Sequence, residues 1–382
     1  MPDSLISSPL AGARAFSQDS EVAAWSQAGL LVTLGVQLTD DSDVLDDLPP
    51  GAVRVPALRR PFGRKDADRM IEEASWDFGP AGSAVTASGS QAEVRARLWS
   101  RATTATAAAA LIYLGMDSRH DVVQVVSASE VLRLGGTADA QAITILAEGC
   151  RSPNHTIRTV AANGLASARP DHPALRGLTT DRAAVPHTRT ATTASLLVHG
   201  TFARLGSTWW KPRGYFFEYI KDNVTSDLYD EPQGFRWTGR YSQSHRTAAA
   251  QDLAKWLKAA SVDLNMVFAH SHGGNVVLDA AAGNEARMSL LILLSVPARR
   301  RSFDEWSAIT RNVRRIFALR SHCDLVVMCD RARQEYSDPP VRTVVLRNTW
   351  FSHDAVLSPE VWQRHNLPEH IRHERLLAGA TS

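Results

Sequence analysis

The sequence predicts an α/β protein in which a doubly wound, mostly parallel sheet occupies residues 195–382 and a small α-helical module precedes it. Three observations lead to this fold class. Short apolar runs alternate with helix-compatible sequence after residue 195, which is typical of parallel sheets covered by helices. One of these runs ends at a serine among small residues, directly before a helix. Upstream of the sheet, a helical pattern repeats after 34 residues.

The composition indicates a globular chain with room for two or three domains. It has 382 residues, of which 44% are hydrophobic and 21% are charged. A net charge of +2 argues against strong attraction to nucleic acid or to an anionic membrane. The cysteines Cys150, Cys323 and Cys329 match neither a disulfide framework nor a zinc spacing. Because we find neither a secretory signal nor an apolar run of roughly 20 residues, we expect a cytoplasmic protein without a transmembrane segment.

Residues 1–95 form an N-terminal segment to which the sequence assigns no role. Gly29–Val36 and Val53–Leu58 are short apolar patches that favour strands. The acidic run Asp40–Asp47 lacks the glycine and the final glutamate of a calcium loop, so it indicates a hydrated linker. We therefore expect no metal site here.

Residues 96–178 carry the internal repeat. The paired positions include Gly115 with Gly149, Ser118 with Ser152, Val123 with Ile157, and Val126 with Val160. Each unit predicts two helices joined by a polar turn, and an apolar stripe on the second helix must pack against a neighbour. The pattern resembles HEAT-like repeats, with an ordinary small helical bundle as the alternative. Such a module would bind a protein partner or restrict access to the next domain, from which the Thr- and Pro-rich residues 179–194 separate it as a linker.

From residue 195 the chain alternates between strands and helices. The expected strands are 195–199, 263–268, 290–294, 316–319 and 341–346, with one helix over 246–260. Sites in such sheets lie at the carboxyl ends of the strands.

Ser271 stands at the end of the second expected strand, in Ala269-His270-Ser271-His272-Gly273. A serine hydroxyl is a poor nucleophile, so it must protrude from a tight turn where a histidine can reach it. Small neighbours permit that turn, although Ala269 stands where the usual G-x-S-x-G pattern has glycine. The helix that begins here would direct the N–H of His272 and its own dipole at a developing oxyanion.

An acid and a base follow the serine in the order that this arrangement requires. Asp324 comes after the fourth expected strand and His353 after the last. The rival acid is Asp330, and His272 and His322 are rival bases. Asp354 is interpreted as solvating its loop.

These motifs, together with His199-Gly200-Thr201, make residues 195–382 resemble an α/β-hydrolase of the lipase and esterase branch. The resemblance implies that Ser271 attacks an acyl carbonyl, that His353 acts as general base and then acid, and that Asp324 orients the imidazole. It also implies an oxyanion hole formed by the N–H groups of Thr201 and His272. His199, Gly200 and Gly273 would support this loop, and no metal or organic cofactor is needed.

Aromatic residues crowd the segment after the oxyanion loop. They include Trp209, Trp210 and Phe216, which would either line an acyl pocket or lid or cover the sheet as ordinary core. The sequence therefore predicts a serine hydrolase that cleaves a small-molecule or lipid carboxylic ester. The alternatives are an interaction scaffold with a little-used hydrolase fold, and a thioesterase or amidase.

Overall fold

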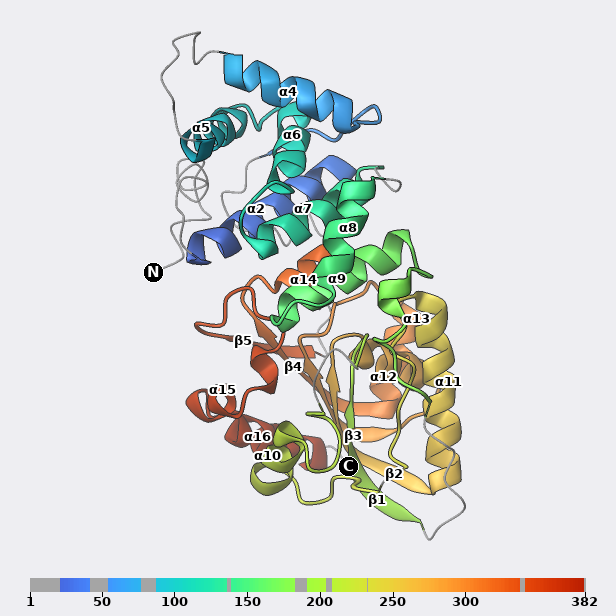
Figure 1. Cartoon of the computed structure of the whole chain (residues 1–382). Helices are drawn as coiled ribbons and strands as arrows, with labels where there is room; N and C mark the ends of the chain where they lie inside the picture. The colour runs from blue at the N-terminus through green and yellow to red at the C-terminus, as the bar shows by residue number, and fades with distance from the viewer. Residues whose placement is uncertain are drawn as a thin grey trace. The chain divides into compact units, whose positions relative to one another are not determined.

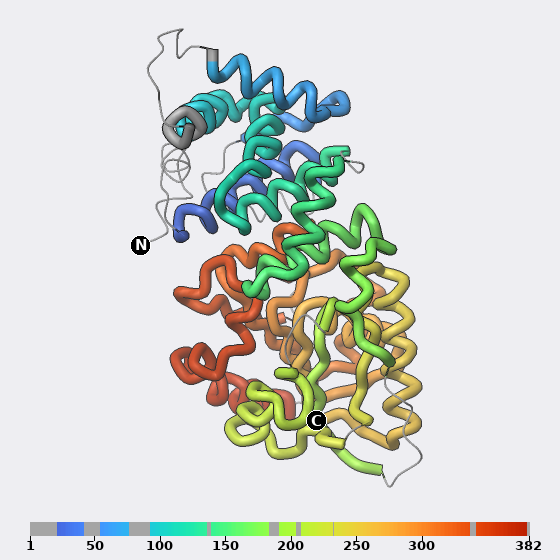
Figure 2. Tube along the Cα trace, in the orientation of Figure 1, coloured from blue at the N-terminus to red at the C-terminus, as the bar shows by residue number. Residues whose placement is uncertain are grey.

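A computed structural model describes residues 21–41, 54–76, 87–135, 139–182, 191–203, 208–231, 233–336 and 341–380. The chain divides into two compact units, whose Cα trace is drawn in Figure 2. A helical unit comprises residues 1–172 together with 328–331, and a second unit comprises residues 173–327 and 332–382.

The second unit is built on a five-stranded parallel sheet (Figure 1). Its strands are β1 (Thr192–Val198), β2 (Val262–His270), β3 (Met288–Leu294), β4 (Val313–Ser321) and β5 (Val341–Leu346). All neighbouring strands pair in parallel, and the order across the sheet is β1-β2-β3-β4-β5. The α/β class and the parallel sheet expected from the sequence are therefore present.

The winding of this sheet differs from the doubly wound arrangement that the sequence led us to expect. The order of the described strands follows the chain without a reversal. Right-handed crossovers that always step in one direction place their helices on one face. Three connecting helices pack there, namely α11 (Gln243–Ala260), α12 (His272–Ala282) and α13 (Phe303–Asn312).

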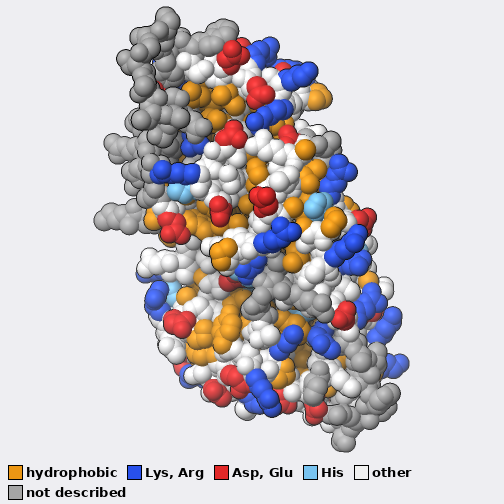
Figure 3. Space-filling model, in the orientation of Figure 1, with side chains coloured by type: hydrophobic (Ala, Val, Ile, Leu, Met, Phe, Trp, Pro, Cys, Tyr) orange, Lys and Arg blue, Asp and Glu red, His pale blue; other side chains and the backbone are white. Residues whose placement is uncertain are grey.

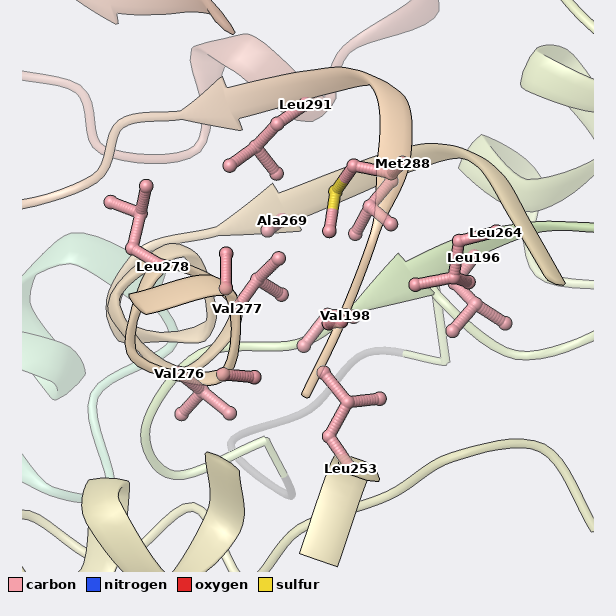
Figure 4. Packing of buried hydrophobic residues seen from close by; sticks show 14 of the residues in the cluster. Leu196, Val198, Leu253, Leu264, Ala269, Val276, Val277, Leu278, Met288 and Leu291 are labelled. Atoms are coloured by element: carbon pink, nitrogen blue, oxygen red, sulfur yellow. The ribbon is translucent and has the colours of Figure 1, made fainter. Parts of the chain in front are cut away.

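The core under these helices comes from one side of each strand. Leu196 and Val198 of β1 and Ala269 of β2 pack with Val276 and Val277 of α12, as Figure 4 shows. Leu253 of α11 points into the same cluster. Because side chains alternate along a strand, β2 presents Ala269 to this face and Phe268 to the other.

The opposite face is covered by helices that lie outside the regular crossovers. They are α10 (Tyr215–Asn223), α15 (Pro359–Arg364) and α16 (Leu367–Ala380). Phe216 of α10 and Trp362 of α15 pack edge to face, with ring centroids 5.3 Å apart, and the Trp362 ring also packs on Phe268 of β2. Helices therefore cover both faces of the sheet, as the sequence predicted, and its carboxyl edge carries the loops considered below.

The helical unit reproduces the 34-residue repeat as two helix pairs. The pairs are α6 (Ala105–Gly115) with α7 (Asp121–Arg133), and α8 (Ala140–Gly149) with α9 (His155–Ala168). Equivalent glycines end the first helix of each pair. A β-carbon on Gly115 would overlap Ser127, and one on Gly149 would lie 2.9 Å from Cβ of Ala161, the residue equivalent to Ser127. The repeat therefore preserves a close helix contact as well as a sequence pattern.

The N-terminal segment is helical where it is described. It forms α2 (Glu21–Thr39), α4 (Arg64–Trp76) and α5 (Ala87–Ser100). The strand expected over Gly29–Val36 is wrong, because these residues lie in α2. Residues 54–58 have no regular structure, although the N–H of Leu58 donates to the carbonyl of Leu38 at 3.2 Å. Val53 and the acidic run beyond Asp41 lie outside the described residues.

Helix α2 is buried on nearly every side, with 15 of its 19 residues inside the unit. It is the one helix in the described ranges that is long and apolar enough to cross a membrane. Its partners are α6 and α7. On the face of each unit that Figure 3 shows, basic and acidic side chains are interspersed, in keeping with the nearly balanced charge.

Candidate active site

Ser271 occupies a strained turn between β2 and α12. Strand β2 ends at His270 and α12 begins at His272, and Ser271 between them has φ 51° and ψ −138°. This backbone region is nearly reserved for glycine and costs about 1–3 kcal/mol for other residues. The turn is held by the Ser271 N–H, which donates to the carbonyl of Leu294 on β3 at 2.9 Å. The strand, turn and helix thus have the geometry expected of a nucleophile elbow.

Two glycines let the loop after β1 approach this turn. A β-carbon on Gly200 would lie 2.7 Å from Cβ of Ser271 and 3.3 Å from its Oγ. A β-carbon on Gly273 would lie 2.9 Å from the carbonyl oxygen of Val198. The loop that contains Thr201 therefore packs directly on the serine turn, and any larger residue at position 200 or 273 would push the two apart.

A hydrogen bond to the segment that contains Gly239 supports the conformation of the loop around Gly200. Phe202 has φ 51°, and its N–H donates to the carbonyl of Gly239 at 2.9 Å. The N–H groups of the first turn of α12, including that of His272, have no acceptor within the helix itself. Thr201 and His272 are therefore placed on the two chain segments that flank Ser271.

His199 is a structural part of this loop. It is buried, its Nδ1 lies 2.9 Å from the carbonyl oxygen of Gly200, and its ring packs between Trp210 and Trp237. Burial lowers the pKa of His199 to about 4, so the imidazole is neutral near pH 7 and Nδ1–H is the donor to Gly200. This arrangement fits the supporting role expected for His199.

Asp324 and His353 form a buried hydrogen-bonded pair. The Nδ1 atom of His353 lies 2.8 Å from Oδ2 of Asp324, and the two side chains are each 1% exposed. The other carboxylate oxygen, Oδ1, accepts the N–H groups of Val326 at 3.0 Å and Val327 at 3.2 Å. Because both oxygens are engaged, the carboxylate has one orientation, and it fixes the proton of His353 on Nδ1.

The acid and base loops are also bonded to each other through the backbone. The N–H of Phe351 donates to the carbonyl of His322 at 3.0 Å, and the N–H of Leu325 donates to the carbonyl of Phe351 at 3.4 Å. The side-chain amide of Gln334 bridges the N–H and the carbonyl of Asp324, at 3.1 and 3.2 Å. The sequence contained no indication of this role for Gln334.

The rival bases, His272 and His322, and the rival acid, Asp330, lie next to other residues than the pair of Asp324 and His353. The Nδ1 atom of His272 lies 3.4 Å from Nδ2 of Asn275, and the ring of His322 packs edge to face on Trp350 with centroids 4.0 Å apart. Asp330 belongs to the segment 328–331 that is part of the helical unit. It is Asp324, rather than a rival, that the structure pairs with His353.

His270 adjoins the site, although the sequence motifs did not indicate a role for it. Its ring centroid lies 4.7 Å from that of His353, and its Nε2 lies 3.8 Å from Oδ1 of Asp354. The alternation of side chains along a strand would have indicated on which face of the sheet His270 lies, because it is two residues after Phe268 and so shares its face. This contact places His353 beside the residue that precedes Ser271.

The three aromatic residues expected at an acyl pocket belong to one buried cluster. Phe216 is fully buried in the core over the second face of the sheet. Trp209 packs edge to face on His270 at 5.5 Å, and Trp210 packs on His199 at 4.5 Å. All three therefore form part of the core, and the two tryptophans also adjoin histidines near Ser271.

In the described part of the chain, no group of three or more His, Cys, Asp or Glu side chains is arranged to hold a metal ion. The chemistry that this arrangement can perform comes from a serine on a strained turn, an oriented imidazole and backbone donors.

No protein-family model matches the sequence, and a comparison with curated proteins finds no relative.

Proposed function

We propose that this protein is a serine hydrolase of the α/β-hydrolase type that cleaves a carboxylic ester of a small molecule or lipid. The observation that carries the proposal is the backbone of Ser271, a non-glycine residue at φ 51° between the end of β2 and the start of α12. Such strain persists where surrounding structure enforces it, and it is frequent at catalytic residues. The buried pair of Asp324 and His353 adds the acid and base that a serine nucleophile needs.

In the proposed reaction, Oγ of Ser271 attacks the acyl carbon while Nε2 of His353 takes the hydroxyl proton. Asp324 keeps the other ring proton on Nδ1 and stabilises the imidazolium that forms. The carbonyl oxygen becomes an oxyanion that accepts from the N–H groups of Thr201 and His272. His353 then gives this proton to the departing alcohol, and the acyl group stays bonded to Oγ of Ser271 as an acyl-enzyme.

Hydrolysis of this acyl-enzyme repeats the sequence with water. His353 takes a proton from the water molecule as its oxygen attacks the acyl carbon, and it returns that proton to Oγ of Ser271. The products are a carboxylic acid and the free enzyme. Each oxyanion donor is expected to contribute about 2.7–4 kcal/mol to lowering the barrier.

A fluorophosphonate probe tests the nucleophile directly. We expect the wild-type protein to be labelled and Ser271→Ala to remain unlabelled. Ser295→Ala is the matched control, because Ser295 is also buried, follows the neighbouring strand β3 and has φ 48°, but no helix begins after it. Folded wild-type protein that resists the probe would rule out the proposed function and favour a non-catalytic scaffold.

A series of substrates tests which kind of acyl bond the protein cleaves and which length of acyl chain it prefers. The same side chains serve thioesters and amides, so p-nitrophenyl esters of increasing chain length should be compared with the matching thioesters and anilides. We expect the highest kcat/KM for esters. A higher kcat/KM for thioesters or anilides would leave the proposed triad in place, but it would replace carboxylic esters as the proposed substrate class.

Location and partners are part of the same proposal. We place the protein in the cytoplasm and assign the helical repeats, as a HEAT-like module, to a protein partner or to limiting access. The regular helix pairs α6–α7 and α8–α9 support a repeat module.

A further inference from the structure

Three arginines of the second unit lie around α12, and none of them has a role in the proposed reaction. Arg246 is near the start of α11, and Arg299 and Arg301 follow β3 in the loop that leads to α13. Helices α11 and α13 both pack against α12 on the same face of the sheet (Figure 1). The three side chains therefore come together within one unit.

Two contacts connect these arginines to the start of α12. In the loop that carries two of them, the carbonyl of Pro297 accepts from Nδ2 of Asn275, in the first turn of α12, at 3.0 Å. On the other side, the guanidinium of Arg246 lies 6.0 Å from the ring centroid of Tyr241, and that ring packs edge to face on His272 at 5.8 Å. The arginines therefore flank the turn that carries a proposed oxyanion donor.

The side chain of Gln243 lies at the centre of the cluster. Its Oε1 accepts from Nη1 of Arg299 at 2.5 Å and from Nε and Nη2 of Arg246 at 3.3 and 3.2 Å. Its Nε2 donates to Oδ2 of Asp279 at 3.4 Å, and Arg301 donates to Oδ1 of the same carboxylate at 2.7 Å. Two cations therefore meet at one neutral oxygen, which accepts their hydrogen bonds without balancing their charge.

No acid balances the charge of Arg299. In the described ranges its hydrogen bond goes to the neutral oxygen of Gln243, and no carboxylate pairs with it. Arg301, in contrast, pairs with Asp279 and lies 3.8 Å from Glu305. The Nε atom of Arg299 is buried and, among the same residues, has no hydrogen-bond partner. A buried donor without an acceptor is unfavourable, so this position suits an acceptor from a ligand.

Two more buried donors near these arginines lack acceptors. They are Nε1 of Trp306, on α13, and the hydroxyl of Tyr336, neither of which has a hydrogen-bond partner in the part of the chain that is described. Their rings pack edge to face with centroids 5.8 Å apart, and Trp306 is 7% exposed. Burial raises the pKa of Tyr336, and the charges of Arg301 and Arg299 oppose this rise. Buried Trp and Tyr usually find partners, so these donors also point to a ligand.

We propose that this cluster is an anion subsite, in which Arg299, Trp306 and Tyr336 bind a phosphate group of the ester substrate. A phosphate has enough oxygens to accept from a guanidinium, an indole N–H and a phenol hydroxyl together, and arginine donors match its geometry. Because the cluster flanks the first turn of α12, one substrate would place its carbonyl at Ser271 and its phosphate at the arginines. The inference rests on the proposed function and narrows its substrate to esters that carry a phosphate.

Binding of inorganic phosphate tests the subsite without turnover. Titration calorimetry at constant ionic strength should show a Kd that is about 10- to 100-fold higher in Arg299→Gln than in the wild type, because hydrogen bonds to charged groups have effects of this size. Arg311→Gln should keep the wild-type Kd, since Arg311 is an exposed arginine of α13 that donates to Oγ of Ser307 instead. No binding by the wild type, or equal Kd values for the two variants, would overturn the inference.

Tyr336→Phe distinguishes a hydroxyl that binds a ligand from one that supports the fold. Since the hydroxyl has no partner among the described residues, its removal should leave the urea unfolding free energy without phosphate unchanged or higher. The Kd of phosphate should nevertheless rise about tenfold. A loss of stability with an unchanged Kd would contradict the subsite. This variant also keeps the inference testable should Arg299→Gln fail to fold.

A matched pair of esters tests whether the phosphate belongs to the substrate. Butanoyl esters of glycerol and of glycerol phosphate differ only in the phosphate, and release of butanoate is measured for both. In the wild type and in Arg311→Gln, kcat/KM should be about 10- to 100-fold higher for the ester with phosphate, and Arg299→Gln should lose most of this difference.

Equal kcat/KM values in the wild type, with phosphate binding intact, would assign the cluster to free phosphate and overturn the inference about the substrate. If neither ester is hydrolysed and phosphate binding still depends on Arg299, the proposed function fails while the anion subsite stands.

Discussion

Gly200 lies so close to Ser271 that a β-carbon at position 200 would stand 2.7 Å from Cβ of the serine. The distance is shorter than real β-carbons adopt, so the contact requires glycine. It brings the peptide that leads to Thr201 beside the hydroxyl. The position of a proposed oxyanion donor relative to the proposed nucleophile therefore depends on the absence of a side chain at position 200.

Gly200→Ala should reduce ester turnover far more than it reduces stability. The added methyl group would displace the loop that carries the Thr201 N–H, and loss of one oxyanion donor lowers kcat by about 10²–10³. Gly177→Ala is the control, because a β-carbon there meets nothing within 4 Å. Steady-state kinetics and thermal unfolding check the prediction. Wild-type kcat in folded Gly200→Ala would remove the oxyanion role of this loop.

Asp324→Asn and Asp330→Asn distinguish the two candidate acids. Asp324 accepts from Nδ1 of His353 at 2.8 Å, whereas an asparagine there would favour the wrong imidazole tautomer. Loss of the acid in a serine triad lowers kcat by about 10⁴. Asp330→Asn should stay close to the wild-type kcat with p-nitrophenyl esters. The assignment is wrong if only the second variant loses turnover.

The positions of the strands along the chain and the serine turn were predictable because local patterns determine them, whereas the winding of the sheet was not. Strand β5 spans Val341–Leu346 as expected, and α12 begins at His272, directly after the serine, as expected. Short apolar runs identify buried strands, and a serine among small residues identifies the turn between one strand and its helix. Asp324 and His353 followed from strand order, since parallel strands bring the residues after their carboxyl ends to one edge.

The N-terminal helices and the supporting contacts were not predictable for physical reasons. α2 is buried on nearly all sides, so its apolar residues lack the 3.6-residue period that distinguishes a helix from a strand. Gln334 bonds to the backbone of Asp324, ten residues away, and no local pattern reveals that contact. The buried ion pair between Glu130 of α7 and Arg331 joins residues that are 201 positions apart in the sequence, which no local pattern reveals.

Gly149→Ala tests the packing within the repeat. Its β-carbon would lie 2.7 Å from Cγ2 of Val125 and 2.9 Å from Cβ of Ala161, so the end of α8 would have to move away from α7 and α9. Overpacking costs about 1–3 kcal/mol, which exceeds the gain of about 1 kcal/mol from replacing a helical glycine by alanine. Urea unfolding should show reduced stability. Gly379→Ala in α16, where a β-carbon meets nothing within 4 Å, should not lose stability, and equal effects would contradict the packing argument.

His199 should make the protein less stable as the pH falls below 6.5. Burial lowers its pKa from 6.5 to about 4, so between these values the unfolded chain binds a proton that the folded chain does not. Stability then rises with pH, by up to about 1.4 kcal/mol per pH unit, and is lost as the pH falls from 6.5 towards 4. Between pH 7 and pH 5 this residue alone should cost about 2 kcal/mol.

His199→Asn isolates that contribution. The asparagine amide can still donate to the Gly200 carbonyl, but it has no proton to gain in this range. The variant will be less stable at pH 7, because it loses the packing of the imidazole against Trp210 and Trp237. The comparison therefore concerns the change between urea unfolding free energies at pH 7 and pH 5. That change should be about 2 kcal/mol smaller in the variant than in the wild type, and equal changes would show that His199 does not remain neutral in the fold.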